Sequence, residues 1–313
     1  MGNKKILLSL DDLLTSDLYF NISKRGRREI IKTSNNTLPS IGNRKRKPIL
    51  TLLFRLNKNM FMRGDNLRFL LDEFNLSVRK FEANIVSIKR GNSGYNNPVE
   101  IKLPLKPTPE LSLLISKCLG DGSVCSDWRF VYSNVEKRLI NEVIECSRKC
   151  IGKSVYKVYF RRNRIYEIKF PSVLGFLLVL MGASRGLKVK NRFRVPEWIM
   201  SGNKEIKSAF IKGIYDDESC VNYSQRSRRI ILAMGKYEKH IDSLINFLND
   251  IKALLNDNGI ESGKINFQQK VKNTVILRFV IYRKVNFEKF QKCVGFSHPK
   301  KQKMLTKICN SYN

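Results

Sequence analysis

The chain has 313 residues, a length that suits one or two folded domains with a hydrophobic core. It carries 59 Lys and Arg residues against 27 Asp and Glu, a formal net charge of +32, and 42% of its residues are hydrophobic. The hydrophobic content excludes a disordered chain, and the charge indicates a polyanionic partner: nucleic acid first, with a ribosome-associated or peripheral membrane protein as the alternatives.

Residues 1–106 are predicted to form a basic, mainly helical N-terminal region, with 21 basic and 9 acidic residues. Residues 21–48 within this region are polar and basic, which is typical either of a solvated loop or of an arm that follows a nucleic-acid backbone. We expect helical structure to begin near Ile49, where the apolar residues start to recur.

Residues 66–90 are predicted to contain two short helices joined by a tight turn, with Ser77 as the N-cap of the second helix. Two interpretations of this pair stay open. It is either a helix-turn-helix that directs Arg79, Lys80 and Lys89 toward DNA, or a plain helical hairpin.

A linker rich in Pro and Gly, at 91–109, precedes an internal repeat with copies at 107–190 and 191–313. Each copy predicts the order helix, two strands, helix, two strands, helix. In the first copy we expect helices at 111–119, 134–150 and 172–182, a hairpin at 123–133, and strands at 156–160 and 166–170. In the second copy we expect helices at 209–215, 236–256, 287–294 and 300–309, a hairpin at 221–232, and strands at 265–269 and 275–282.

The first helix of each copy is an apolar run that stops at a carboxylate. One run reads Leu-Leu-Ile-Ser-Lys-Cys-Leu-Gly-Asp-Gly-Ser and carries Asp121, and the other reads Phe-Ile-Lys-Gly-Ile-Tyr-Asp-Asp-Glu-Ser and carries Glu218. Small residues one turn apart, Ser116 and Gly120 in one helix and Gly213 in the other, would let the two helices pack closely. Both carboxylates would then lie at one end of the pair, where two acids in a strongly basic chain indicate a metal site beside a polyanion and hence a nuclease.

These motifs resemble the LAGLIDADG homing endonuclease family in its single-chain, two-motif form, over residues 107–313. Val195-Pro196-Glu197-Trp198-Ile199 and the segment Val294-Gly295-Phe296-Ser297-His298-Pro299-Lys300-Lys301 are also similar to that family. The resemblance implies an α+β fold of two pseudo-symmetric αββαββα halves, with the motif helices at their interface and antiparallel sheets forming a DNA-binding saddle. It implies a site-specific endonuclease for double-stranded DNA; the alternative is an RNA-splicing maturase that acts on intron RNA, or a non-cleaving DNA-binding regulator.

The resemblance also implies the metal ligands. The last acid of each motif, Asp121 and Glu218, would hold Mg²⁺ or Mn²⁺, with the main-chain carbonyls of Gly120 and Asp217 as further donors. Asp216 would be a structural acid, and Asp217 is the alternative to Glu218 as the second metal ligand. The sequence departs from the family pattern at three positions, since Ser116 replaces Gly, Asp217 replaces a small residue and Ser219 replaces Gly.

Basic side chains near the two acids would stabilise developing charge or orient water. By position in the repeat, the candidates for catalysis are Lys188 (or Lys190) and Lys301, with Asn134 and Lys236 as further ones. Recognition of DNA is expected from the strands, because a two-stranded ribbon fits the major groove. The candidates are Arg129, Arg161, Arg162, Arg164 and Lys169 in the first half, and Gln225, Arg226, Arg228, Gln268, Lys270 and Arg278 in the second.

The remaining features bear on the setting of the protein. Its seven Cys residues form no Cys-x-x-Cys pair, which argues against a zinc knuckle and favours reduced thiols in a cytoplasmic protein. The most apolar run, 173–183, is too short to cross a bilayer, so no membrane is expected. The ends of the chain lack the residues that protein splicing needs, so we expect a free-standing or intron-encoded product that works as a monomer on an asymmetric site.

Overall fold

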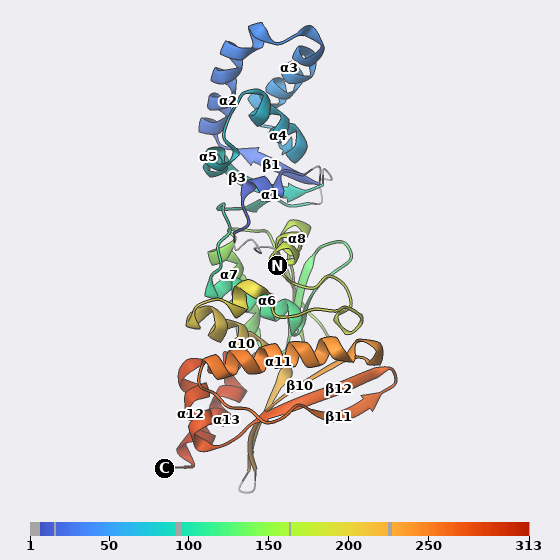
Figure 1. Cartoon of the computed structure of the whole chain (residues 1–313), viewed down its shortest axis with the longest axis vertical. Coiled ribbons are helices and arrows are strands. Elements are labelled where there is room, and N and C mark those ends of the chain that lie inside the picture. The colour runs from blue at the N-terminus through green and yellow to red at the C-terminus, as the bar shows by residue number, and fades with distance from the viewer. Residues whose placement is uncertain (1–6, 16, 92–95, 163, 225–226, 313) are drawn as a thin grey trace.

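The computed structural model describes residues 7–15, 17–91, 96–162, 164–224 and 227–312. Within them the chain forms three four-stranded antiparallel sheets. The N-terminal region, the first half and the second half follow one another along the longest axis of the molecule (Figure 1). No helix in these residues combines the length and the apolar character that crossing a membrane requires.

The first half contains one sheet and the helices that cover it. Its elements are α6 (Pro109–Leu119), β5 (Gly122–Val124), β6 (Phe130–Asn134), α7 (Lys137–Cys150), β7 (Lys157–Phe160), β8 (Tyr166–Lys169) and α8 (Ser172–Leu180). Thr108 caps the N-terminus of α6 by accepting a hydrogen bond from Leu111 N–H, and Pro109 follows at the first helical position. The strand order in the sheet is β5-β6-β8-β7.

The second half repeats this plan. Its elements are α9 (Glu197–Met200), α10 (Lys204–Glu218), β9 (Ser219–Ser224), β10 (Ser227–Tyr237), α11 (Ile241–Asp257), β11 (Asn266–Val271), β12 (Thr274–Ile281), α12 (Lys284–Cys293) and α13 (Pro299–Asn310). The strand order, β9-β10-β12-β11, is that of the first half. The predicted α+β fold of two αββαββα halves is therefore confirmed, with α9 and α13 as additions to the second half. The prediction that a helix begins at 236 is wrong, because β10 continues to Tyr237 and α11 begins at Ile241.

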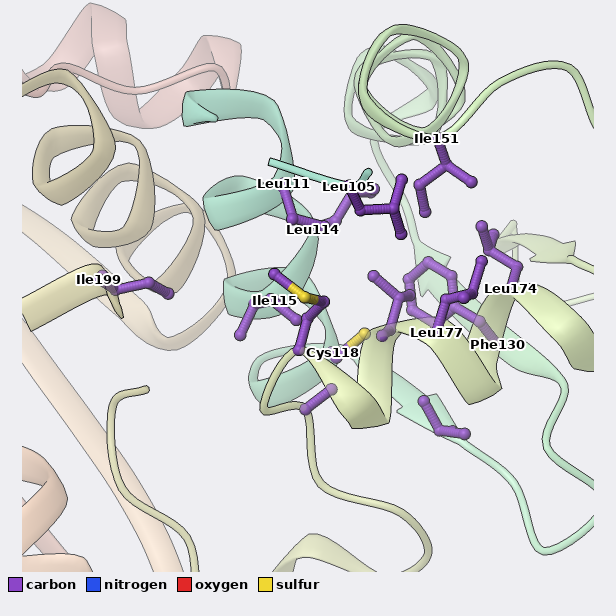
Figure 2. Close-up of a cluster of buried hydrophobic side chains, with 14 of the residues drawn as sticks. Leu105, Leu111, Leu114, Ile115, Cys118, Phe130, Ile151, Leu174, Leu177 and Ile199 are labelled. Atoms are coloured by element: carbon purple, nitrogen blue, oxygen red, sulfur yellow. The ribbon is translucent and has the colours of Figure 1, made fainter. Parts of the chain in front are cut away.

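The hydrophobic core of the first half lies between its sheet and helices. Figure 2 shows Ile115 and Cys118 of α6, Leu174 and Leu177 of α8, and Phe130 of β6 gathered at the contact. All five side chains are buried. Burying them anchors α6 to its own half, so that the position of the helix end is fixed by packing on one side and by α10 on the other.

The N-terminal region contains more regular structure than the sequence predicted. Its elements are α1 (Leu10–Leu13), β1 (Leu18–Ile22), α2 (Lys24–Thr37), α3 (Asn43–Asn57), β2 (Met62–Arg63), α4 (Gly64–Glu73), α5 (Val78–Phe81), β3 (Ile85–Arg90) and β4 (Val99–Glu100). Of the two interpretations of residues 21–48, the solvated loop is wrong, because α2 and α3 cover most of that segment. Its basic side chains occupy the solvent faces of helices whose buried faces are narrow, and this conceals the helical period.

The two short helices predicted at 66–90 correspond to α4 and α5, but the end of that segment is a strand. Residues 85–90 form β3, which pairs with β1, so Lys89 lies on a strand and not on a helix. Arg79 and Lys80 lie on α5, which has four residues and is too short to cross a groove of DNA as a recognition helix. The helix-turn-helix interpretation is therefore not supported at this position.

Candidate active site at the ends of the motif helices

The two motif helices, α6 and α10, pack against each other through two close contacts. An ideal Cβ placed on Gly213 would overlap the Ser116 hydroxyl and lie 3.0 Å from Ser116 Cβ. An ideal Cβ on Gly120 would lie 2.7 Å from Asp217 Cβ. Each contact therefore requires a glycine on one helix, and the side chain that faces it comes from the other helix.

The pseudo-symmetry of the halves relates these two contacts. Counting back from the acids Asp121 and Glu218, Gly120 corresponds to Asp217 and Ser116 corresponds to Gly213. At each pair of equivalent positions one helix carries the larger residue and the other carries glycine. Two of the departures from the family pattern, Ser116 and Asp217, are thus each accommodated by a glycine across the interface.

The two motif acids lie where the helices end and the strands begin. Asp121 follows Gly120, the C-cap of α6, and precedes β5; Glu218 is the last residue of α10 and precedes β9. Loss of hydration raises the pKa of Glu218 to about 7; Lys188 opposes this rise, and the carboxylates of Asp121 and Asp217 add to it. The two acids are therefore electrostatic neighbours, as the packing of their helices requires.

Asp121 is held by groups from both halves. Asn134 donates a hydrogen bond from Nδ2 to Asp121 Oδ2 at 2.8 Å, and Asp121 N–H donates to Asp217 Oδ2 at 3.0 Å. Although Asp121 is exposed, the loss of hydration at its carboxylate raises its pKa to about 6, the Asp217 carboxylate raises it further, and Lys188 opposes both effects.

The Asp217 carboxylate accepts hydrogen bonds from groups inside the protein. Lys117 Nζ and Tyr132 OH each lie 2.8 Å from Asp217 Oδ1. The side chains of Lys117 and Asp217 have no exposed surface. With its lone pairs committed to Lys117, Tyr132 and the N–H of Asp121, the Asp217 carboxylate is poorly placed to bind a metal, and only its main-chain carbonyl keeps that potential.

Lys117 and Tyr132 were not predicted from the sequence. Burial lowers the pKa of the Lys117 amine, but the carboxylates of Asp217 and Asp216 outweigh this effect and leave the pKa raised. Lys117 therefore remains charged inside the helix interface. A lysine within an otherwise apolar helical run was the one available signal, because a buried charge requires a buried counter-charge.

Asp216 contacts the C-terminal loop. It accepts hydrogen bonds from Ser297 N–H at 3.3 Å and from His298 N–H at 2.9 Å. Burial raises its pKa to about 6, an effect that Lys117 opposes. These contacts suit the structural role expected for Asp216, because they hold the loop before α13 against the end of α10.

Two lysines lie at the ends of the motif helices. Lys188, in a short 3-10 turn, donates to Leu119 O at 3.4 Å, and Lys301 of α13 donates to Tyr215 O at 3.1 Å and Asp216 O at 2.5 Å. The carbonyls at a helix C-terminus carry partial negative charge, so an amine is stabilised there. The structure thus brings both lysines beside the two acids, one for each helix.

Lys236 occupies a different setting beside Glu218. A small cavity of about 200 Å³ is lined by both residues, together with Leu119, Lys188, Val189, Phe193, Met234, Gly235 and Leu244. The Lys236 amine lies 3.3 Å from the centre of the Phe193 ring and makes no hydrogen bond among the described residues. Loss of hydration lowers its pKa to about 8. In the first half, Asn134 at the end of β6 instead bonds Asp121.

The donors at this site fit a hard divalent cation better than a metal that takes a full set of side-chain ligands. No group of three or more His, Cys, Asp or Glu side chains within the described ranges is arranged to hold a metal ion. The Glu218 carboxylate makes no hydrogen bond or ion pair with any described group, and the other available donors are the Asp121 carboxylate and main-chain oxygens. Mg²⁺ accepts one or two carboxylates and completes its shell with water and phosphate oxygens.

In the first half, two of the predicted DNA-contacting residues, Arg161 and Lys169, lie beside Tyr159 on one face of the sheet. Tyr159 lies opposite Glu167 in the register of β7 and β8, and Arg161 and Lys169 each form an ion pair with Glu167, at 2.6 and 3.2 Å. Of the others, Arg129 pairs with Asp127 between β5 and β6, and Arg162 and Arg164 lie in the turn between β7 and β8.

In the second half, the predicted residues divide between the two faces of the sheet. Arg278 lies opposite Ala233, on the face away from the core, and Gln268 lies at a bulge in the edge strand β11. Arg228 shares the core-facing side with Ile230 and lies over the Tyr312 ring at 4.7 Å, while Lys270 pairs with Glu238 at 2.7 Å. The structure does not bring Arg228 and Lys270 together with Arg278. Gln225 and Arg226 lie outside the described residues.

No protein-family model matches the chain. Among curated proteins it is 29% identical over 132 residues to the tRNA-splicing ligase RtcB of Methanopyrus kandleri, covering 42% of this chain and 13% of that protein. It is 25% identical over 230 residues to the glutamine–fructose-6-phosphate aminotransferase of Methanocaldococcus jannaschii, covering 71% of this chain and 19% of that protein. The chain spans less than a fifth of the length of each of these relatives.

Two solved structures are similar to parts of the chain. The homing endonuclease I-DmoI in complex with DNA and Ca aligns with a TM-score of 0.44 and 15% identity, over 64% of this chain and 97% of that one. Full-length DUF199/WhiA from Thermatoga maritima aligns with a TM-score of 0.43 and 13% identity, over 66% of this chain and 61% of that one. The fold described above stands on the matching strand order of the two halves.

Proposed function

We propose that the protein is a site-specific endonuclease that hydrolyses phosphodiesters in double-stranded DNA, with a divalent cation held by Asp121 and Glu218. The observation that supports this proposal is the placement of the two carboxylates at adjoining ends of tightly packed helices. The resemblance of the motifs to LAGLIDADG endonucleases points to the same chemistry.

The electrostatics of the site agree with a cation there. Two carboxylates with raised pKa values lie together, and the Glu218 carboxylate makes no hydrogen bond or ion pair with the described groups. A bound Mg²⁺ or Mn²⁺ would supply the missing positive charge, polarise the scissile phosphate and lower the pKa of a bound water. Lys188 and Lys301 each add a positive charge beside the acids, where they would attract the DNA phosphates and stabilise developing charge.

Binding of DNA would use the helix-free faces of the sheets in the first and second halves, which we call the two central sheets. On that face the first half carries Tyr159, Arg161 and Lys169, and the second half carries Arg278. Because the two halves differ at these positions, the target would be asymmetric, and because one chain carries both halves, we propose a monomer.

The test is selection of cleaved sites from a random-sequence duplex library, with Mg²⁺ and with EDTA. The proposal expects one family of long sites to be cut only when Mg²⁺ is present. Glu205→Gln serves as the matched control variant for the motif acids, because Glu205 is exposed at the opposite end of α10 and should leave cutting unchanged. Stable binding of selected duplexes without any cutting would instead support a non-cleaving DNA-binding regulator, and acceleration of intron splicing without DNA cutting would support a maturase.

A further inference from the structure

Helix α3 presents an exposed face that the fold of the N-terminal region does not use. Six residues at helical spacing line a shallow surface hollow of about 520 Å³: Asn43, Arg46, Lys47, Leu50, Thr51 and Phe54. We call these six residues the α3 face. The opposite side of the helix supplies the buried residues Ile49, Leu52, Leu53 and Leu56, so α3 is already anchored without the α3 face.

The α3 face exposes large apolar side chains. Leu50 is 49% exposed and Phe54 is 62% exposed, on a helix whose core contacts are complete. Exposed apolar side chains of this size, set among polar residues, are common where a protein contacts a partner. Their position on one side of a regular helix indicates a partner with a groove that accepts a helix.

The charge around the α3 face identifies the chemistry of that partner. Residues 24–58 contain eleven Lys and Arg and one acidic residue, Glu29. Lys45 is paired with Glu73 at 3.2 Å, whereas Arg46 and Lys47 form no ion pair within the described ranges. Their charges are therefore available to a polyanion.

We propose that the α3 face binds duplex DNA in the major groove, on the part of the target that flanks the first half. This inference rests on the proposed function, which brings a duplex to the two central sheets, and it extends the DNA contact to the N-terminal region.

An α-helix fits the major groove of B-form DNA, and a helix of 15 residues, about 22 Å long, can lie across it. Asn43, Arg46 and Lys47 can reach base edges or phosphates, and Leu50 and Phe54 can contact thymine methyl groups. The deep, narrow major groove of A-form RNA does not admit a helix, which favours DNA over double-stranded RNA.

The N-terminal region is fixed to the first half, so the direction of α3 is set. A backbone bridge joins Val99 to Ser154, Glu100 N–H donates to Lys153 O at 2.9 Å, and the Arg90 guanidinium lies 5.0 Å from the centre of the Trp128 ring. The three parts of the molecule follow one another along its longest axis (Figure 1). A duplex that covers both central sheets would run along this axis, so its continuation past the first half passes the N-terminal region.

The experiment measures binding of the full chain, in EDTA so that strands stay intact, to a duplex of about 60 bp selected for binding from a random library. Two double variants divide the α3 face by chemistry: Leu50→Ala with Phe54→Ala, and Arg46→Ala with Lys47→Ala. All four side chains are exposed, so folding should be preserved, and circular dichroism would check this. Footprinting maps the protected base pairs for each protein.

We expect Leu50→Ala with Phe54→Ala to weaken binding about tenfold and to abolish protection of the flank, without changing the salt dependence of binding. The charge pair should lower the slope of log K against log salt by about 2, because each lost phosphate contact removes about 0.9. Trimming the flank from the duplex should make the wild type bind as weakly as the variants.

The matched control removes two exposed charges from α2 instead, with Arg25→Ala and Arg28→Ala, and should keep the flank protected. The inference is overturned if the variant with Leu50→Ala and Phe54→Ala still protects the flank. It is also overturned if the α2 control loses protection of the flank to the same extent, since this would indicate unspecific charge attraction. Binding of the α3 face to anionic vesicles or to double-stranded RNA in preference to the duplex would also overturn it. This test needs no cutting of DNA. A protein that binds as expected but never cleaves would contradict the proposed function and leave this inference intact.

Discussion

The Asp217 carboxylate on α10 accepts a hydrogen bond from the main-chain N–H of Asp121, which follows α6, at 3.0 Å. The same carboxylate is held by Lys117 of α6 and Tyr132 of β6. An acid from the second half thus fixes the main chain at the acid of the first half. The two halves are joined at the candidate active site by charge as well as by close packing.

Removing the charge of Lys117 should destabilise the protein strongly. Lys117→Met leaves the buried Asp217 and Asp216 carboxylates without their counter-charge, and we expect a loss of about 3–5 kcal/mol in the free energy of unfolding. Urea unfolding measures this loss. Lys45→Met is the control, because Lys45 pairs with Glu73 at the surface and should cost less than about 1 kcal/mol.

A second substitution checks the cause of that loss. Asp217→Ala in the Lys117→Met background removes one of the two stranded carboxylates, so it should recover part of the stability. If Lys117→Met alone unfolds like the wild type, the amine is not required in the interface.

The fit of Gly213 against Ser116 makes a reciprocal prediction. Gly213→Ala introduces a methyl group where the Ser116 side chain lies, and we expect destabilisation by about 1–3 kcal/mol. Adding Ser116→Gly should restore most of the stability, because the larger residue is then on the other helix. Thermal unfolding compares these proteins with Gly42→Ala, since a Cβ at Gly42 meets no atom within 4 Å. A rescue that fails would show that the overlap is relieved in another way.

The raised pKa of Glu218 makes the metal-free protein sensitive to pH. Its pKa is about 7 in the folded state against an ordinary value of 4.5 for Glu, so between these two pH values the folded protein keeps a proton that the unfolded chain has lost. Stability should therefore fall as pH rises from about 4.5 to about 7. Glu218→Gln should flatten this fall and stabilise the protein at pH 8 by about 1–2 kcal/mol, allowing for solvent screening.

Chemical unfolding in EDTA across this pH range measures the effect, with Glu205→Gln as the control that keeps the wild-type slope. Added Mg²⁺ should stabilise the wild type more than Glu218→Gln at pH 8, because a bound cation offsets the ionised carboxylate. Identical pH profiles for Glu218→Gln and the wild type would argue against an unusual carboxylate at this position.

The buried amine of Lys236 should reduce stability near neutral pH. Its pKa is lowered to about 8 by loss of hydration, so the folded state binds its proton less readily than the unfolded chain. Lys236→Met should therefore be more stable than the wild type at pH 7, by about 1–2 kcal/mol, and the difference should shrink as pH rises from about 8 to about 10.5. An unfolding series over pH 6–10 measures this. If Lys236→Met were less stable than the wild type at pH 7, the charged amine would be stabilised in the folded protein by a hydrogen bond or an opposite charge.

The internal repeat made the order of helices and strands in the first and second halves predictable. The apolar period of each copy gave the order of helices and strands, and the register of the motifs placed Asp121 and Glu218 at the helix ends. The same register placed Lys188 and Lys301 near the acids, because equivalent positions in a repeat have equivalent surroundings. The roles of these four residues stay predictions.

The remaining features depend on contacts between distant segments. The pairing of β1 with β3 joins residues about 70 positions apart along the chain, which no local pattern indicates. The network of Lys117, Tyr132 and Asp217 depends on which residues face each other across a helix interface. A basic helix such as α3 resembles a solvated loop in sequence, because its few buried residues leave most of its surface polar.

The most direct test of the account is cleavage of a selected duplex by Asp121→Asn and by Glu218→Gln, measured beside binding of the same duplex. If the two carboxylates jointly hold the cation, each substitution should reduce Mg²⁺-dependent cutting by at least about a hundredfold while the dissociation constant for DNA changes little. Full cutting by either variant, with the wild-type requirement for Mg²⁺, would contradict the assignment of these two acids to the active site.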